Sequence, residues 1–253
     1  MTRVVAIVPA KGSSDRIANK NMRILDGEHL FKRKLRQLLE CPLLTQVCLD
    51  TEDDRIAEIA ADLPVLRLHR PRELASNQTD GHALFAWECA QVDADIYVQA
   101  ICTAPFVTAE TVTRAVQALL DAPDRDSCVA VTETKQYLWS DGAPTYGYGS
   151  VPNSVDLPAT MVEAMSLYAV RGSKKKKPAQ RFGKKPILLP LTPEESIDVN
   201  WPEDLALAET IAAGHRATEN LALQALAPYL GAAMLSDITR EMGLTCALPR
   251  ALR

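Results

Sequence analysis

The feature that most constrains the fold is an alternation of short apolar runs with amphipathic segments along the first half of the chain. The apolar runs are rich in β-branched residues and have the length of buried strands, at residues 4–8, 45–49, 65–68, 96–101 and 127–131. Segments with helical spacing lie between them, at residues 29–40, 55–62, 82–90 and 109–120. This alternation predicts an α/β fold, with a mostly parallel sheet and helices on both of its faces.

The alternation stops at residue 132. Residues 133–163 contain Gly, Pro, Asn and aromatic residues without a helical period, which predicts an inserted arm or lid with short strands. A last helix is predicted over residues 203–213, with Pro202 in its first turn and Gly214 at its end. We interpret residues 1–213 as the main domain and residues 214–253 as a helical C-terminal extension. Further strands are predicted at 164–170, 186–191 and 196–200, and further helices at 219–230 and 235–242.

Composition argues against several classes of function. The 253-residue chain has a net charge of −4, which is unfavourable for a nucleic-acid-binding protein. No apolar run reaches about 18 residues, so no membrane-spanning helix is expected, and the start of the chain lacks the pattern of a signal peptide. The six cysteines are scattered without a C-x-x-C pair, which favours a reduced, cytoplasmic protein without zinc.

The loop after the first strand concentrates groups that bind phosphate. Its sequence, PAKGSSDRIANKN, holds Gly12, the hydroxyl groups of Ser13 and Ser14, and the cations Arg16 and Lys20. Backbone N–H groups, hydroxyls and cations all favour anions. The loop does not have P-loop spacing, and no G-x-G-x-x-G follows a strand, so it would bind a nucleotide in another way.

Two further loops are predicted to lie at the same edge of the sheet. HRPRELASNQTDG follows the strand at 65–68 and carries Arg70 and Thr79, and CTAP follows the strand at 96–101. Ligands of parallel sheets bind beyond the carboxyl ends of the strands. The three loops therefore define one candidate site.

Four motifs in order resemble those of the CMP–sugar-acid synthetases, the sialic acid and Kdo cytidylyltransferase family. They are PAKGSSDRIANKN, HRPRELA, VQAICTAPF and ESIDVNWPEDLALAE, and the resemblance extends over about residues 3–213. It implies a three-layer α/β/α fold, Rossmann-like, with the mostly parallel sheet of nucleotide-diphospho-sugar transferases. It also implies a homodimer in which the arm at 133–163 exchanges between subunits.

The resemblance implies a reaction in which an acceptor oxygen attacks the α-phosphorus of CTP and pyrophosphate leaves. Such a transfer depends on positioning and charge neutralisation. Lys11, Arg16 and Lys20 would hold the triphosphate, and Asp198 would bind Mg²⁺. The implied nucleotide-binding positions are Pro9, Ala10, Gly12, Ser13, Ser14, Asn21, Arg70, Thr79 and Gln99. Candidate acceptor contacts are Thr103 in the CTAP loop and the arm residues Lys135 and Glu163.

The chain departs from the family pattern at three places. The usual loop reads Arg-Gly-Gly-Ser-Lys, and this chain has Lys11 in place of the Arg and Asp15 in place of the Lys. Lys11 keeps the positive charge but cannot form the bidentate contacts of an arginine, and Asp15 reverses the charge at its position. Asn200 replaces the second carboxylate of a usual D-x-D, so the number of bound metal ions, one or two, stays open. Asp198 is the better metal ligand of the two residues. The third departure, CTAP in place of the commoner TSP, lies where the acceptor would bind.

The acceptor is open between two classes. Residues 135–168 resemble a branch of the family that transfers CMP to small phosphonates in natural-product biosynthesis, and we favour this acceptor over a sialic or other ulosonic sugar acid. The basic run at 171–185, with eight cations and no acid, is compatible with a dianionic acceptor or with a solvated loop. Other hypotheses are a non-catalytic nucleotide-binding or scaffold protein and a sugar-1-phosphate transferase that uses another nucleotide.

Overall fold

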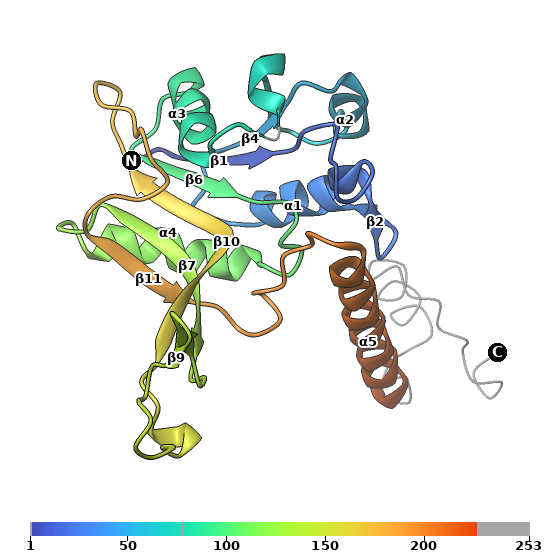
Figure 1. Ribbon diagram of the computed structural model, residues 1–253. Helices are drawn as coiled ribbons and strands as arrows, with labels where there is room; N and C mark the ends of the chain where they lie inside the picture. The colour runs from blue at the N-terminus through green and yellow to red at the C-terminus, as the bar shows by residue number, and fades with distance from the viewer. Residues whose placement is uncertain (1, 77, 227–253) are drawn as a thin grey trace.

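The computed structural model describes residues 2–76 and 78–226 and centres on a seven-stranded sheet (Figure 1). The strands lie in the order β11-β7-β10-β6-β1-β4-β5, and all are parallel except β10, which is antiparallel to both neighbours. The predicted mostly parallel sheet is confirmed. The strands are β1 (Val4–Pro9), β4 (Gln46–Thr51), β5 (Leu66–His69), β6 (Ile96–Ala100), β7 (Ser127–Thr134), β10 (Thr160–Arg171) and β11 (Pro186–Pro190).

Helices cover both faces of the sheet because successive side chains of a strand point in opposite directions. In β1, Val4, Ala6 and Val8 belong to the apolar cluster that α1 and α4 cover, whereas Val5 and Ile7 face α3. This is the three-layer α/β/α arrangement expected from the sequence. The helices are α1 (Leu30–Leu39), α2 (Asp54–Ile59), α3 (Gly81–Gln91) and α4 (Ala109–Asp121), with short 3₁₀ turns η1 (Lys20–Met22) and η2 (Arg72–Ala75).

Three of these helices begin at a side chain that caps them. Asp53, Asp80 and Thr108 each accept a hydrogen bond from a backbone N–H in the first turn of α2, α3 and α4. Such caps satisfy N–H groups that have no partner within the helix. They also fix where each loop at the ligand edge of the sheet ends.

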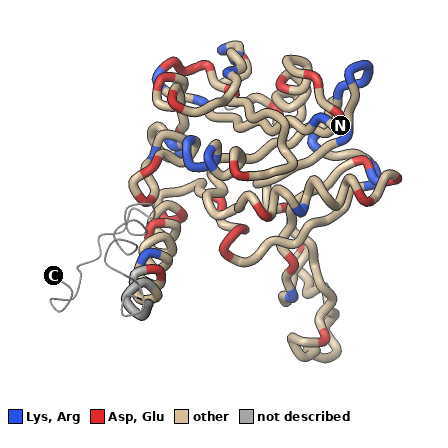
Figure 2. The backbone as a smooth tube through the Cα atoms, turned by 180° about the vertical axis from the view of Figure 1, so that it is seen from behind, with Lys and Arg blue, Asp and Glu red and all other residues tan. Residues whose placement is uncertain are grey.

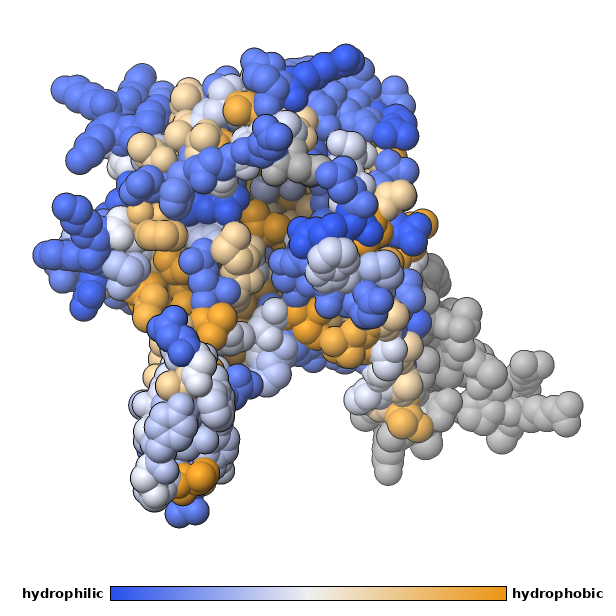
Figure 3. Space-filling model, viewed as in Figure 1, coloured by the Kyte–Doolittle hydropathy of each residue, from blue (hydrophilic) through white to orange (hydrophobic). Residues whose placement is uncertain are grey.

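Between β7 and β10 the chain forms an arm that projects from the body of the molecule, seen as a separate lobe at the lower left of Figure 3. It contains β8 (Trp139–Ser140), β9 (Ala143–Pro144) and the 3₁₀ turn η3 (Ser154–Asp156). Trp139, Tyr148, Val151 and Val155 on it are more than half exposed. A role of the arm in dimerisation stays a prediction.

The predicted strand at 196–200 is wrong. Residues 193–196 form a turn that Thr192 and Glu195 close with reciprocal hydrogen bonds, and the chain then crosses to the sheet edge as an irregular loop. Val199 of this loop is buried, and its N–H donates a hydrogen bond to the Thr103 carbonyl at 2.7 Å. This bond is not part of the hydrogen-bond ladder of a sheet. Apolar alternation over five residues was too short to distinguish this loop from a strand.

The last described helix is longer than predicted. α5 (Pro202–Leu226) runs through Gly214, which has no positive φ, and ion pairs of His215 with Glu194 and of Arg216 with Asp26 hold the helix beyond that point. The predicted end at Gly214 is therefore wrong, because these tertiary contacts outweigh the low helix propensity of one glycine. The helix expected at 219–230 begins inside α5, and its end and the helix expected at 235–242 lie outside the described residues.

Two expectations from composition can be compared with the described part of the chain. Within it, no helix has the length and apolar character needed to cross a membrane. The cysteines that it contains, at positions 41, 48, 89, 102 and 128, are free and buried. A cytoplasmic location stays a prediction.

Gly214→Ala should raise the free energy of unfolding by roughly 0.5–1 kcal/mol, because alanine is the better residue in a helix interior. Among the described residues, and apart from the adjacent backbone of the helix, no atom lies within 4 Å of the Cβ that would be added. The matched control is Gly27→Ala in the hairpin of β2 (Ile24–Leu25) and β3 (Glu28–His29), where the added Cβ is equally uncrowded but φ is +79°. That change should destabilise by roughly 1 kcal/mol. Urea unfolding measures both, and destabilisation by Gly214→Ala would place the helix end at Gly214 after all.

Candidate functional site

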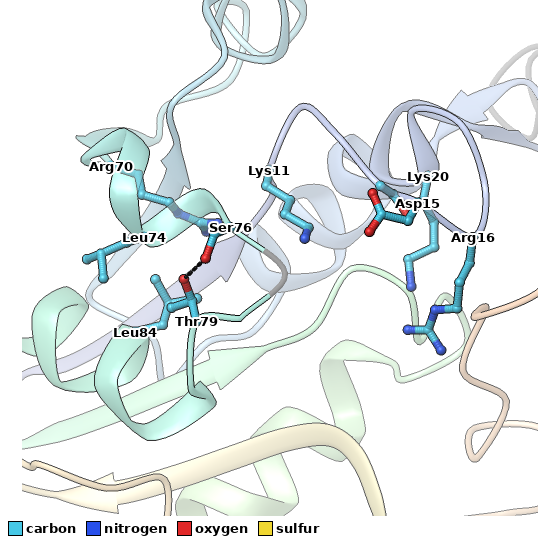
Figure 4. A pocket seen from close by; sticks show the side chains of 10 residues that line it. Lys11, Asp15, Arg16, Lys20, Arg70, Leu74, Ser76, Thr79 and Leu84 are labelled. Carbon is cyan, nitrogen blue, oxygen red and sulfur yellow. Dashed lines mark hydrogen bonds between the residues drawn. The ribbon is translucent and has the colours of Figure 1, made fainter.

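A pocket of about 500 Å³ opens at the edge where the parallel strands β1, β4, β5 and β6 end (Figure 4). The loop at residues 9–21 forms one wall, and the segment from Arg70 to the first turns of α3 forms the other. A smaller pocket of about 180 Å³ shares part of this lining. Lining the larger pocket are Lys11, Ser14, Asp15, Arg16, Lys20, Arg70, Leu74, Ser76, Thr79 and Leu84, and the smaller one adds Pro9, Asn21, Ile101, Cys102 and Thr103.

The 9–21 loop is held in shape by contacts with neighbouring segments. The Asn21 side chain donates to the Lys11 carbonyl at 2.9 Å, and the Gly12 N–H donates to Glu52 at 2.8 Å. At position 12 a Cβ would lie 2.1 Å from an oxygen of Asp53, so only glycine allows the loop to approach the end of β4 this closely. Asn21, predicted as a nucleotide contact, therefore also supports the loop from within.

Four cations converge on the pocket. Partial burial lowers the pKa of Lys11 and of Lys20 below the usual lysine value, and the positive charge of Arg16 adds to the effect at both. Asp15 beside Lys11 and Asp198 beside Lys20 act in the opposite direction. Crowded, partly dehydrated cations favour a polyanion, which would offset their mutual repulsion.

Asn200 and Asp198 connect two of these cations to the loop after β6. The Asn200 side-chain oxygen accepts hydrogen bonds from Arg16 at 2.8 Å and from Lys20 at 3.1 Å, and its amide nitrogen donates to Asp198 at 2.5 Å. The other carboxylate oxygen of Asp198 accepts from the Thr103 hydroxyl at 2.5 Å. Arg16 also lies over the ring of Trp201, 5.3 Å from its centre. Of the four predicted catalytic residues, Arg16, Lys20 and Asp198 are thus brought together, and Lys11 lines the same pocket as the other two cations.

The residues present fit a single Mg²⁺ ion better than two. In the described part of the chain, no three His, Cys, Asp or Glu side chains gather as a metal site. Asp198 offers one carboxylate beside the pocket cations, and Mg²⁺ is often bound by one or two carboxylates together with substrate phosphates and water. The Asn200 oxygen, the other predicted ligand, is already engaged by two cations.

Arg70 lies at the floor of the pocket in a buried ion pair. Its Nε atom is 3.0 Å from both carboxylate oxygens of Asp50, and its Nη2 atom also contacts that carboxylate. Burial alone would lower the pKa of Arg70, but the hydrogen bonds that it donates to Asp50 and the charge of that carboxylate outweigh burial, so the guanidinium is firmly charged. Thr79, in the wall that begins at Arg70, shares a hydrogen bond with Ser76 at 3.1 Å. Both predicted positions, Arg70 and Thr79, therefore line the pocket.

Four other predicted nucleotide positions, Gln99, Ala10, Gly12 and Ser13, line neither of these pockets. Gln99 is fully buried on β6 and donates to Glu88 at 2.5 Å, without lining either pocket. Ala10 is buried and its N–H bonds to the Asp50 carbonyl at 2.9 Å. Ser13 lines a separate surface pocket beside Gly12 and the acidic start of α2.

A side pocket of about 220 Å³ lies along the start of α3, and none of its lining residues lines the main pocket. It brings Arg181 of the basic run next to His82, a residue to which sequence reasoning gave no role in the site. The Glu163 carboxylate, a predicted acceptor contact, lies here and accepts from the Tyr168 hydroxyl at 2.5 Å. Lys135 instead bonds to the Val155 carbonyl within the arm. The lining is Asp80, Gly81, His82, Glu163, Met165, Arg181 and Phe182.

The basic run at 171–185 divides into two parts. β10 pairs Arg171 with Ile96 at the start of β6, so the lysines that follow lie at the opposite end of the sheet from the main pocket, as Figure 2 shows near the N-terminus. Of these, Lys174, Lys175 and Lys176 are exposed, as the solvated-loop alternative expects. Arg181 turns back over the Tyr168 ring, 5.1 Å from its centre.

Lys34 is a supporting residue that sequence reasoning missed, although its place on the apolar stripe of α1 could have revealed it. It is 1 % exposed and donates to the Val107 carbonyl at 2.7 Å, while Gln37 donates to Pro105 at 2.9 Å. These bonds fasten the loop that carries Thr103, and through it Asp198. Burial lowers the pKa of Lys34 to about 7.

The folded state therefore favours neutral Lys34, whereas the unfolded chain keeps this lysine charged up to a pKa near 10.5. The unfolded state binds more protons between these values, so Lys34 should make stability rise with pH above about 7, by roughly 1 kcal/mol per pH unit. Lys34→Met should lack this rise, and the exposed control Lys175→Met should keep it. Urea unfolding at pH 6.5, 8 and 9.5 measures the difference, and parallel curves for all three proteins would contradict a buried neutral amine.

Comparisons with known proteins identify the family of this chain. The model of the cytidylyltransferase family matches residues 5–143, more than half of the chain. CMP-N,N'-diacetyllegionaminic acid synthase of Legionella pneumophila is 28% identical over 124 residues, 46% of this chain and 52% of its own. The chain thus spans about half the length of that relative.

Two further likenesses extend along most of the chain. The 2-C-methyl-D-erythritol 4-phosphate cytidylyltransferase of Chromobacterium violaceum is 26% identical over 230 residues, 83% of this chain and 98% of its own. The solved structure of CMP:2-keto-3-deoxy-manno-octonic acid synthetase with CTP superimposes with a TM-score of 0.62, over 85% of this chain and 100% of that one, at 14% identity. The last comparison shows a shared fold. Together with the ordered motifs and the cationic pocket, the match of the family model shows that this chain belongs to the cytidylyltransferase family.

Proposed function

We propose that the protein is a CTP-dependent cytidylyltransferase that transfers CMP to a small acidic acceptor and releases pyrophosphate. The observation that carries the proposal is the convergence of Lys11, Arg16, Lys20 and Arg70 on one pocket beside Asp198. Pyrophosphate is the leaving group, and its developing charge needs fixed cations more than a covalent catalyst. Because the pocket is lined largely by charged and polar groups, it suits a triphosphate better than an apolar ligand.

Each residue has a role that follows from its position. Lys11 and the Ser14 side chain, which line the pocket, hold the phosphates, while Arg16 and Lys20 neutralise charge on the departing pyrophosphate. Asp198 would hold Mg²⁺, which when bound neutralises charge on the phosphate oxygens. Thr103 and Asn200 fix both carboxylate oxygens of Asp198 at 2.5 Å, so the carboxylate is oriented before the substrate arrives.

The side pocket supports an acidic acceptor. Thr79 lines the main pocket and its sequence neighbour Asp80 lines the side pocket, and we place the acceptor in the side pocket, at the start of α3. Arg181 offers a planar fork that suits a phosphonate, phosphate or carboxylate. The pocket volume of about 220 Å³ favours a small phosphonate. An ulosonic sugar acid is the second candidate, supported by the name of the Legionella pneumophila relative.

We further propose that the protein acts as a homodimer through its arm. The exposed side chains of Trp139, Tyr148 and Val155 form an apolar surface that a second copy would cover. The arm begins at β7 and returns in β10 next to the side pocket, so a partner's arm would also lie near the acceptor.

The decisive assay measures pyrophosphate release with CTP, Mg²⁺ and a panel of small phosphonates, ulosonic sugar acids and phosphorylated polyols. Asp198→Ala should reduce kcat at least about a hundredfold while the protein stays folded, because an uncompensated charge in the transition state costs several kcal/mol. The control is Asp124→Ala, an exposed acid outside both pockets. CTP binding without turnover of any acceptor would favour the non-catalytic scaffold, and equal affinity for CTP, UTP, GTP and ATP would contradict the choice of cytosine.

Arg181→Gln should raise KM for the acceptor about tenfold or more and leave KM for CTP unchanged, because the fork faces only the side pocket. Arg181→Lys should have an intermediate effect, since it keeps the charge but not the bidentate geometry. Arg125→Gln, at an exposed position, is the control for the loss of one positive charge. If Arg181→Gln changes KM for CTP and leaves KM for the acceptor unchanged, the side pocket is not the acceptor site.

A further inference from the structure

Four polar side chains lie buried side by side beneath the floor of the main pocket. Asp50 on β4, Glu88 on α3 and Gln99 on β6 are each 0% exposed, and Arg70, at the end of β5, is 6% exposed. They come from both the sheet and the helix that covers it. Burying so many polar groups in one place is costly unless each is paired, which suggests a function beyond packing.

The contacts form a chain that ends at the pocket. Gln99 donates to Glu88 Oε2 at 2.5 Å, the Glu88 carboxyl is a hydrogen-bonding neighbour of Asp50, and Asp50 accepts from the Nε and Nη2 atoms of Arg70. Arg70 is the member of the chain that lines the pocket. Its Nε and Nη2 atoms are committed to Asp50, which leaves Nη1 for a ligand.

The chain holds two carboxyl groups but one cation. Two adjacent carboxylates cannot both ionise in a dry interior, so one of them retains its proton. Burial and the negative charge of Asp50 both raise the pKa of Glu88 well above its usual value, and Asp50 is the carboxyl that contacts the guanidinium. The other titratable neighbours, the thiols of Cys48 and Cys89, have pKa values raised by burial and are neutral.

The hydrogen-bond pattern agrees with a proton on Glu88. Its Oε1 atom is buried and has no partner if the group is ionised. A proton on the Glu88 carboxyl lets this group donate to Asp50, which then accepts from Glu88 on one side and from Arg70 on the other. The Asp50 carboxylate is then held from both sides, and the guanidinium that it orients cannot rotate freely.

We propose that Glu88 is a positioning residue for nucleotide binding: as a neutral buried acid it fixes Asp50, which in turn holds Arg70 in place at the floor of the pocket. The inference rests on the proposed function, since it takes CTP as the ligand. A guanidinium that is oriented in advance loses little freedom when the nucleotide binds. Glu88 itself touches no ligand.

The test measures the Kd of CTP by calorimetry, with Mg²⁺ and the full chain. Glu88→Gln keeps a neutral donor and acceptor and should leave Kd within about twofold of wild type, whereas Glu88→Leu removes both and should weaken binding about tenfold. Glu58→Gln and Glu58→Leu, at an exposed position on α2, are the matched controls. If Glu88→Leu does not fold, Gln99→Met takes its place, and wild-type affinity in the folded variant overturns the inference.

A double-mutant cycle separates positioning from a general loss of structure. Arg70→Lys keeps the charge but loses the fork, so Glu88→Leu should weaken CTP binding little further in that background. Full additivity would overturn the role through Arg70. If wild-type protein itself does not bind CTP, the proposed function fails and this inference with it. If wild type binds CTP and Glu88→Leu binds it equally well, the inference alone fails.

Stability as a function of pH tests the proton independently of any ligand. The unfolded chain releases the Glu88 proton near pH 4.5 while the folded protein keeps it, so wild type should lose stability relative to Glu88→Gln as pH rises. The ratio of their folding constants should change by up to about tenfold per pH unit between pH 5.5 and 7.5. A constant ratio would show that Glu88 is ionised in the fold and would overturn the inference.

Discussion

Repulsion between cations is the constraint on which the rest of the site depends. Lys11, Arg16, Lys20 and Arg70 surround one pocket, and each must be held there before any anion arrives. These cations are held in different ways. Arg70 pairs with the buried carboxylate of Asp50, whereas Arg16 and Lys20 both donate hydrogen bonds to the neutral side-chain oxygen of Asn200. A second carboxylate at position 200 would bind these two cations more tightly and compete with a phosphate for them. The amide holds them and still leaves their charge available.

The elements that sequence predicted well are those whose signal is local and repeated. β1 and β6 are buried on both faces, so their apolar runs are continuous, and the loops that follow parallel strands meet at one edge as a consequence of topology. Arg70 and the 9–21 loop were placed correctly for this reason. The position of Gln99 away from the pocket was not predictable, because a residue near the end of a strand can point to either face of the sheet. Only the hydrogen bond to Glu88 shows on which face the Gln99 side chain lies.

The remaining errors have one physical origin, contacts between residues distant in sequence. Gly214 stays helical because Arg216 pairs with Asp26, nearly two hundred positions earlier. The side pocket joins Arg181 to the start of α3, where Arg181 N–H donates to His82 at 3.2 Å, and neither position carries a local motif. The resemblance to known families identified the nucleotide side of the site, whose motifs are contiguous, and left open the acceptor side, which is assembled from separate segments.

The stacking of Arg16 on Trp201 has a consequence for observing the protein. Trp201 is 53% exposed at the start of α5, and its indole lies against a guanidinium that would have to turn toward a triphosphate. An indole is a natural fluorophore whose emission depends on nearby charge and water. The chain has three tryptophans, and neither Trp87 nor Trp139 lines the main pocket. Trp201 thus gives the molecule an optical signal of its own beside Arg16, a residue that lines the main pocket.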